Sequence, residues 1–556
     1  MVKIKLELEK IMLIIFFAAM LYLGPGILFG HSISHDFPFA YGASDAFQHY
    51  TRAEAIKDIG NRYEASYIVK GNEDFVVIYP PLMYQLAVMI SYASGLEIYD
   101  AIYFVIVFLA AISTLIMYFV IANFNKAVAI LSLPFSLLIF SFPASTGFLW
   151  GHWPSVLAQL FLILVFWTAS RVELKNSFIL MSIAFSATVF SHTSSTVFAF
   201  IFLAVFFTLK LILKKLTKEE FKAALFAAIA FILISFYYLV IFLNTWARRQ
   251  AYVFSVQPIW EGNPGFYIAG FGLLLVPIAF GIIFSLTRIR ALDVAVVSSI
   301  VMLIGSHLNY IGFEVRSFQM RFFWPIYFSF FAGFGIYILL KFILKKWNYA
   351  YSTVAFIILM LLFSGIVKFP IITQTDVQAI PYILQLNRGT SQGLMNPFHW
   401  EALVWLRDNT PQNSNLYFFY GDLYGQDAIL RIAKRVHQQV DPENFVNALQ
   451  ERKIEREYIS EWPGDTSGSF VQRLSFFRFK DAEVAPGAHF GPRDICTFDY
   501  LVFDKVSSQH VLAQYNLLIA SELLQKDYIS SVFENGAVVI LKNNNLGADC
   551  IEERNF

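Results

Sequence analysis

Residues 223–243, AALFAAIAFILISFYYLVIFL, form an apolar run with no charged side chain. About 20 such residues are needed for a helix to cross the hydrocarbon core of a bilayer. Ten further apolar runs surround it, at residues 11–30, 98–123, 127–143, 153–171, 176–192, 193–213, 266–286, 291–308, 321–343 and 350–369. The whole chain is 57% hydrophobic and 15% charged, which is more apolar surface than a soluble domain could bury. The sequence therefore predicts a polytopic α-helical membrane protein.

Lysine and arginine clusters predict the orientation of these spans. They occur near residues 3–10, 171–175, 210–222, 288–290 and 341–346, and cytoplasmic loops carry an excess of such residues. This pattern predicts a cytoplasmic N-terminus in the cell membrane and places loops 31–81, 144–152, 244–265 and 309–320 outside. Residues 82–96 are short for a span and would break the charge pattern, so they are interpreted as an interfacial or re-entrant helix. About eleven spans result.

The composition changes near residue 370 to that of a globular domain. Residues 399–411, HWEALVWLRDNTP, predict an amphipathic helix with Trp400, Leu403, Val404 and Leu406 on its apolar face. NLYFFY, YLVFDKV and AVVILKN are typical of strands, FENGAV of a hairpin turn, and QHVLAQYNLLIASELLQK of a helix. We therefore expect a membrane module over residues 1–369 and an extracytoplasmic α/β domain over residues 370–556.

Candidate catalytic groups lie in the first external loop. In SDAFQHYTR, helical spacing would place Asp45, His49 and Arg52 on one face, where the carboxylate could serve as a general base or metal ligand. Asp36 and Glu54 are further acidic groups expected within reach. The alternative is structural: Ser44 and Asp45 would cap a helix that lies on the membrane.

The order of these features resembles the GT-C class of membrane glycosyltransferases. The similarity lies in SDAFQHYTRAEAI after the first span, in IYPPLMYQL, and in FHWEALVWLRDNTP. The last stretch is similar to the start of the external domain in the catalytic subunit of oligosaccharyltransferase and its archaeal relatives. The resemblance covers the full length in layout but only these three stretches in residues.

The resemblance implies an inverting transferase that uses a sugar linked to a polyprenyl (dolichyl) phosphate. Asp45 matches the catalytic Asp of the class, with His49 beside it, and the acceptor would be a protein, a lipid or a surface glycan. A phosphate leaving group must be stabilised, and arginine presents a planar fork to phosphate oxygens. The external arginines that could do so are Arg321, Arg316, Arg248 and Arg249. Asp36, Arg52, Tyr79 and His152 are the candidate substrate-binding residues.

The sequence also departs from the oligosaccharyltransferase pattern. Residues 417–425, YFFYGDLYG, replace a WWDYG-type motif, and the second external loop contains His152 but no carboxylate. Asp36, Asp45 and Asp74 could form an oxygen-rich site, so a divalent cation such as Mg²⁺ or Mn²⁺ is left open. Cys496 and Cys550 could form a disulfide in an exported domain or stay as free thiols.

Other functions are weighed by where the charges lie. A transporter or flippase for lipid-linked or small polar substrates would carry ionisable groups within its spans. Here the span interiors hold almost none, and the charges lie in external loops, which favours chemistry at the surface. A third alternative is a scaffold without activity. No G-x-G-x-x-G or P-loop motif occurs, which agrees with a lipid-linked donor, and no basic stripe indicates nucleic acid.

Overall fold

The computed structural model describes residues 8–60, 79–140, 146–248, 274–308, 326–343, 350–364, 393–419, 421, 423–424, 427–439, 495–506 and 510–546. The chain forms two compact units. The first comprises Met1–Ser34, Pro80–Leu96 and Asp100–Ser391. The second comprises His35–Tyr79, Glu97–Tyr99 and Gln392–Phe556. The predicted domain boundary near residue 370 lies outside the described residues.

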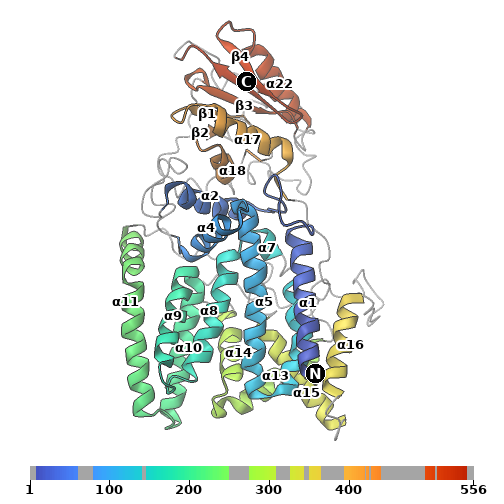
Figure 1. Ribbon diagram of the computed structural model, residues 1–556, viewed down its shortest axis with the longest axis vertical. Helices are drawn as coiled ribbons and strands as arrows, with labels where there is room; N and C mark the ends of the chain where they lie inside the picture. Colours follow the sequence, from blue (N-terminus) through green and yellow to red (C-terminus); the bar gives the residue numbers. More distant parts are fainter. Residues whose placement is uncertain are drawn as a thin grey trace, which may run out of the picture. The chain divides into compact units, whose positions relative to one another are not determined.

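The first unit is helical throughout its described part, and Figure 1 shows α1, α5, α9, α10 and α11 running roughly parallel. Its helices are α1 (Leu8–Leu28), α4 (Leu82–Ser94), α5 (Ile98–Phe124), α6 (Lys126–Ser136), η2 (Leu137–Phe140), α7 (Thr146–Leu149), α8 (Trp153–Ala169), α9 (Ser177–Ser191), α10 (Thr193–Ile212), α11 (Lys218–Arg248), α13 (Leu275–Arg288), η5 (Ile289–Ala291), α14 (Val294–Gly305), α15 (Ser329–Ile343) and α16 (Ala350–Ser364). Each of the eleven predicted apolar segments thus contains a helix.

Four of these helices have the length and composition to cross a membrane: Glu9–Leu28, Ile98–Phe124, Thr193–Ile212 and Lys218–Val240. The outer surface of α11 is apolar, and Leu233 is 72% exposed. Such a surface is stable against lipid but not against water. The protein is therefore a membrane protein. The other apolar helices are shorter, so the number of spans stays a prediction.

Capping residues and glycines explain several helix ends. Asn125 accepts hydrogen bonds from the backbone N–H groups of Ala127 and Val128 and so starts α6. Gly95 ends α4 in the left-handed conformation, with φ of 75°. The interfacial or re-entrant segment predicted at residues 82–96 is indeed a short helix, and its placement relative to a membrane stays a prediction.

Glycines allow α13 and α15 to approach at backbone distance. A Cβ atom on Gly335 would lie 1.8 Å from the carbonyl oxygen of Pro277, and one on Gly281 would lie 2.0 Å from that of Phe331. Because each helix presents a glycine to the backbone of the other, the two helices pack without intervening side chains. Small residues at such interfaces are typical of helix packing in membranes.

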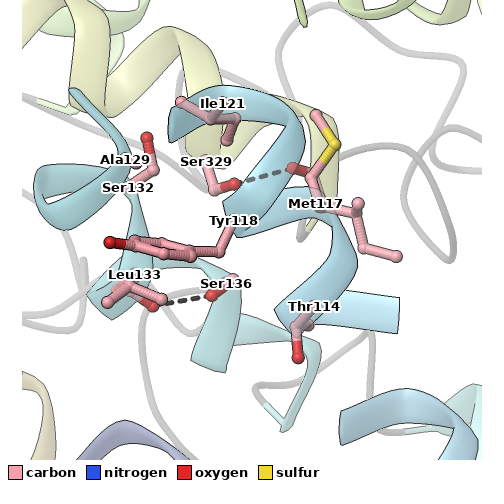
Figure 2. Close-up of a pocket in the computed structure, with 10 residues that line it drawn as sticks. Thr114, Met117, Tyr118, Ile121, Ala129, Ser132, Leu133, Ser136 and Ser329 are labelled. Carbon is pink, nitrogen blue, oxygen red and sulfur yellow. Dashed lines mark hydrogen bonds between the residues drawn. The ribbon is translucent and has the colours of Figure 1, made fainter. Parts of the chain in front are cut away.

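Within the same unit, the serine and threonine hydroxyl groups near α5, α6 and α15 bond to backbone carbonyls of the preceding helical turn rather than line an open site. The cavity there has a volume of about 10 Å³, room for roughly one water molecule, and Figure 2 shows residues that line it. Around it, Ser132 donates to the Val128 carbonyl at 2.8 Å and Ser136 to the Leu133 carbonyl at 2.7 Å. This cavity is too small to hold a sugar.

The second unit contains a five-stranded mixed sheet in the order β2-β1-β3-β5-β4. Its elements are α2 (Ser44–Ile59), α17 (Pro397–Asn409), β1 (Asn415–Phe418), α18 (Asp427–Leu430), η9 (Arg431–Ala433), β2 (Val436–Gln439), η10 (Ile495–Thr497), β3 (Tyr500–Asp504), α22 (His510–Leu523), β4 (Ile529–Glu534) and β5 (Val538–Asn543). Strands β2, β1 and β3 are parallel, and β5 is antiparallel to both neighbours. Every residue of β3 is buried, as expected for a central strand.

The strands and helices predicted in this part of the sequence are found as β1, β3, β5, α17 and α22, and FENGAV forms the β4–β5 turn. Helix α17 starts at Asn396, whose side chain accepts a hydrogen bond from the N–H of His399, and ends before Pro411. The four residues predicted for the apolar face of α17 differ in burial, and the buried face also includes His399 and Ala402. The buried residues are His399, Ala402, Leu403 and Leu406, whereas Trp400 and Val404 are half-buried.

Candidate active site

Helix α2 carries the candidate catalytic residues and is the first described helix after α1. Asp45 lies in its first turn and is half-buried, where a carboxylate stabilises the positive end of the helix dipole. The N-cap residue is Ala43, which makes no side-chain capping hydrogen bond. In the structural alternative, Ser44 and Asp45 would cap this helix. The structure instead places Ala43 at the N-cap position. The helix ends at Gly60, which adopts φ of 79°.

One face of α2 holds the three residues that the sequence places together. Asp45, His49 and Arg52 are four and three residues apart, so they follow one another along a single helical face. His49 contacts the ring of Tyr79 edge-on, with ring centroids 5.3 Å apart. The Arg52 guanidinium lies over the same ring, 4.8 Å from its centre, in a cation–π contact. Both side chains are buried, so this face is fixed by its contacts with Tyr79.

The opposite face of α2 carries a partly buried ion cluster, in which Glu54 and Lys434 are buried and Asp58 is exposed. Lys434, directly after η9, places its Nζ atom 2.5 Å from Asp58 Oδ2 and 3.3 Å from Glu54 Oε2. Glu54 follows Asp45 by nine residues, about two and a half helical turns, and so projects away from it. The expectation that Glu54 lies within reach of the Asp45 site is therefore wrong, because its carboxylate pairs with Lys434 on the other side.

Aromatic side chains fix the N-terminal half of α2. Tyr50 packs against Trp400 of α17 and against Tyr99, with ring centroids 6.2 Å and 6.0 Å away. Tyr99 in turn packs edge-on against Trp400 at 5.6 Å and donates a hydrogen bond to the His35 carbonyl at 2.7 Å. Tyr41 donates a hydrogen bond to the Tyr99 carbonyl. This aromatic cluster joins α2, residues 35–41 and α17 within the second unit.

Burial raises the pKa of Glu54 above its usual value, and the nearby Asp58 carboxylate adds to this, although Lys434 and Lys57 oppose it. The ammonium group of Lys434 does not fully compensate the loss of hydration of the buried Glu54 carboxylate, and it is shared with Asp58. A carboxyl group with a raised pKa in the folded state favours the neutral form. Its contribution to stability is complete below the unfolded pKa and is lost as the pH rises through the folded pKa.

The melting temperature of the wild type minus that of Glu54→Gln measures what the Glu54 carboxyl group contributes. We therefore expect this difference to be more positive at pH 4 than at pH 8. Thermal unfolding in lipid nanodiscs across this range measures the difference. Glu534→Gln, at an exposed carboxylate of β4, serves as the control and should show little pH-dependent difference. A wild-type advantage that grows with pH would contradict the expectation.

Asp36 and His152, predicted to bind substrate, lie in different surroundings. Asp36 is exposed in the segment before α2. His152 belongs to the first unit, where it is the N-cap residue of α8, and its N–H donates to the Gly147 carbonyl at 2.9 Å. This backbone hydrogen bond helps to fix the turn that precedes α8. A substrate role for either residue stays a prediction.

Of the four arginines predicted to bind phosphate, one lies within the described residues. Arg248 is the last residue of α11 and not part of a loop, because the residues from Asn244 to Ala247 contain no glycine or proline to end the helix earlier. Arg249, Arg316 and Arg321 lie outside the described residues. Their proposed role therefore rests on the sequence.

No cluster of three or more His, Cys, Asp or Glu side chains suited to a metal ion occurs among the described residues. Asp74, one of the three candidate ligands, lies outside them. Metal dependence therefore stays open. Cys496 is buried and disulfide-bonded, whereas Cys550, the other cysteine of the chain, lies outside the described residues.

Sequence reasoning missed a buried polar group beside the sheet. The Nε2 atom of His399 on α17 lies 3.1 Å from Oδ2 of Asp504, at the end of β3, and both side chains are almost fully buried. The ring of Tyr424 packs against His399 at 5.7 Å, and burial raises the pKa of its hydroxyl, with the charge of Asp504 adding to the shift. The sequence did contain a signal for this group. His399 precedes Ala402 and Leu406 by three and seven residues, so it lies on the same helical face as these apolar residues.

No protein-family profile and no curated protein sequence matches this chain. Solved structures do match it, and they show that the chain has the fold of the GT-C membrane glycosyltransferases, as the sequence resemblance indicated.

Two of these structures are of the oligosaccharyltransferase from Archaeoglobus fulgidus. The apo form has a TM-score of 0.55 and 12% identity over 91% of this chain and 72% of that one. The form tethered to an acceptor peptide with an NVT sequon has a TM-score of 0.56 and 13% identity over 97% and 74%. ArnT from Cupriavidus metallidurans, bound to undecaprenyl phosphate, has a TM-score of 0.50 and 10% identity over 97% and 98%.

Proposed function

We propose that this protein is an inverting glycosyltransferase that moves a sugar or glycan from a polyprenyl-phosphate-linked donor to an acceptor on the outer face of the cell membrane. The fold it shares with an oligosaccharyltransferase and with ArnT supports the general reaction. The acceptor class is a protein, a lipid or a surface glycan. The tethered acceptor peptide of the Archaeoglobus fulgidus structure gives the protein acceptor its support.

The observation that carries this proposal is the position of Asp45. It is the acidic residue of the first turn of α2, and its carboxylate lies on the face that also holds His49 and Arg52. The carboxylates of Glu54, which is buried, and of Asp58, which is exposed, both pair with Lys434 on the opposite face of the helix. Asp45 is half-buried and keeps part of its surface accessible, as a general base must.

In the proposed reaction, the acceptor hydroxyl or amide nitrogen attacks the anomeric carbon of the donor sugar. The bond between that carbon and the phosphate oxygen breaks on the opposite face, and its electron pair stays on the polyprenyl phosphate or pyrophosphate. The proton of the acceptor passes to the Asp45 carboxylate. Attack opposite the leaving group inverts the anomeric configuration.

The other predicted residues have supporting roles in this scheme. We assign His49 to the proton transfer with Asp45, because imidazole is the commonest group for this task and lies one turn away. Arg52, held over Tyr79, is assigned to the acceptor side together with Asp36 and His152. Arg321, with Arg316, Arg248 and Arg249, is assigned to the donor phosphate, where fixed positive charge stabilises the leaving group.

The test is a transfer assay with the wild-type protein in nanodiscs. Short-chain polyprenyl-phosphate sugars and the matching nucleotide sugars are offered in parallel, with host membrane extract as acceptor, and released polyprenyl phosphate is measured. We expect release from the lipid-linked donor only. Flux of the intact donor across liposomes without cleavage would instead favour the transporter or flippase alternative.

A further inference from the structure

We propose that Lys434 is a positioning residue for the Asp45 site and that it acts by clamping the back of α2 to the sheet-containing part of the second unit. The expected effect on the rate of glycosyl transfer rests on the proposed function, whereas the expected effect on the stability of α2 does not. Lys434 touches neither Asp45 nor its face of the helix. It binds Glu54 and Asp58, which lie one turn apart on the opposite face.

The clamp is anchored by backbone geometry on the Lys434 side. Lys434 itself adopts a left-handed conformation with φ of 51°, which turns the chain between η9 and β2. The neighbouring Arg435 donates hydrogen bonds to the carbonyl oxygens of Arg407 and Thr410, both at 2.5 Å, and to the Thr410 hydroxyl at 3.0 Å. Those groups form the C-terminal end of α17, so α17, η9 and β2 are joined at one point. Lys434 projects from that point to α2.

On the face opposite Asp45, two contacts hold α2 along its length, in addition to the contacts of His49 and Arg52 with Tyr79 on the Asp45 face. Tyr50 packs on Trp400 toward the N-terminal half, and Lys434 binds Glu54 and Asp58 in the C-terminal half. A helix fixed at two points on one face presents its other face in a defined orientation. A loss of even one of these contacts would let Asp45 move, and a displacement of about 1 Å in a catalytic group can cost roughly a hundredfold in rate.

Burying Glu54 and Lys434 costs desolvation energy, and an apolar contact in their place would serve stability equally well. A lysine that is 8% exposed and binds two carboxylates instead fixes the helix register, because only one rotation of α2 presents both acids to it. We therefore infer that the cluster specifies orientation. The sequence positions involved are 380 residues apart, which is why no local pattern reveals them.

The experiment compares Lys434→Met with Lys434→Arg and with a matched control, Lys505→Met. Lys505 forms an ion pair with Glu534 at 2.9 Å in the same unit but does not contact α2 through that pair. In Lys434→Met we expect faster hydrogen exchange of the backbone amides of residues 50–59 and a kcat about tenfold lower with little change in KM. Lys434→Arg should restore both, and Lys505→Met should change neither.

The two readouts separate this inference from the proposed function. Hydrogen exchange of α2 does not depend on activity, so faster exchange in Lys434→Met alone would support the clamp even if no glycosyl transfer is found. Unchanged exchange in Lys434→Met would overturn the clamp whatever the activity of the wild type. Equal loss of exchange protection in Lys434→Met and Lys505→Met would also overturn it, because the effect would then be general destabilisation.

Discussion

Asp45→Asn is expected to lower the rate of glycosyl transfer by about a hundredfold to ten-thousandfold, the range by which a general base accelerates a reaction. The amide keeps the size and most of the polarity of the carboxylate but cannot take the acceptor proton. Because Asp45 is half-buried and lies in the first turn of α2, the substitution should leave the fold intact. Release of polyprenyl phosphate by purified protein in nanodiscs measures the effect.

The control for this variant is Asp408→Asn, the same chemical change at a largely exposed carboxylate that pairs with Arg407 in the second unit. It should transfer sugar at the wild-type rate. If Asp45→Asn kept full activity, the base would have to be sought at Asp36 or elsewhere. A melting temperature equal to that of the wild type would show that lost activity is not lost structure.

Gly335→Ala is expected to prevent accumulation of folded protein. The added methyl group would lie 1.8 Å from the Pro277 carbonyl oxygen, a backbone atom that cannot rotate away, so α13 and α15 would have to separate. Overpacking costs about 1–3 kcal/mol where side chains can adjust and more where backbones must move. A monodisperse peak in fluorescence-detected size-exclusion chromatography reports the amount of folded protein.

Gly536→Ala, in the β4–β5 turn, is the matched control for this change. Its added methyl group would meet only the ring of Phe398, at 3.2 Å, and that side chain is exposed and able to shift. Gly281→Ala should behave like Gly335→Ala, because its methyl group would meet the Phe331 carbonyl oxygen. Normal yields of both helix variants would show that α13 and α15 can pack at a larger distance.

The parts of the fold that the sequence predicts are those determined locally. Long apolar runs specify helices, and the short apolar runs of β3 and β5, rich in β-branched and aromatic residues, are recognisable as buried strands. Strand β2, VHQQ, carries no such pattern, and its parallel pairing with β1 becomes visible only in the structure. Span number is less well determined, because several apolar helices are shorter than a bilayer is thick.

The candidate site was predictable on one face of α2 only. The spacing of Asp45, His49 and Arg52 is a property of the helix itself, and Tyr79 follows closely in the chain. The partner of Glu54 is Lys434, and no pattern in the sequence connects these two distant residues. His399 was missed because a search for apolar faces passes over histidine, and its buried neighbour Asp504 comes from β3, a distant segment of the chain.

The pairing of α2 with Lys434 also orders events during synthesis. At about 5–20 residues per second, the 380 residues between Glu54 and Lys434 take roughly 20 to 80 s to be made. Throughout that interval the ribosome has released Asp45 and its helix, but the lysine that fixes them does not yet exist. A nascent chain would thus insert its early apolar helices long before its candidate catalytic helix has a partner. The site would therefore be completed last. Premature termination anywhere before residue 434 would yield a membrane-inserted protein in which α2 lacks its contact with Lys434.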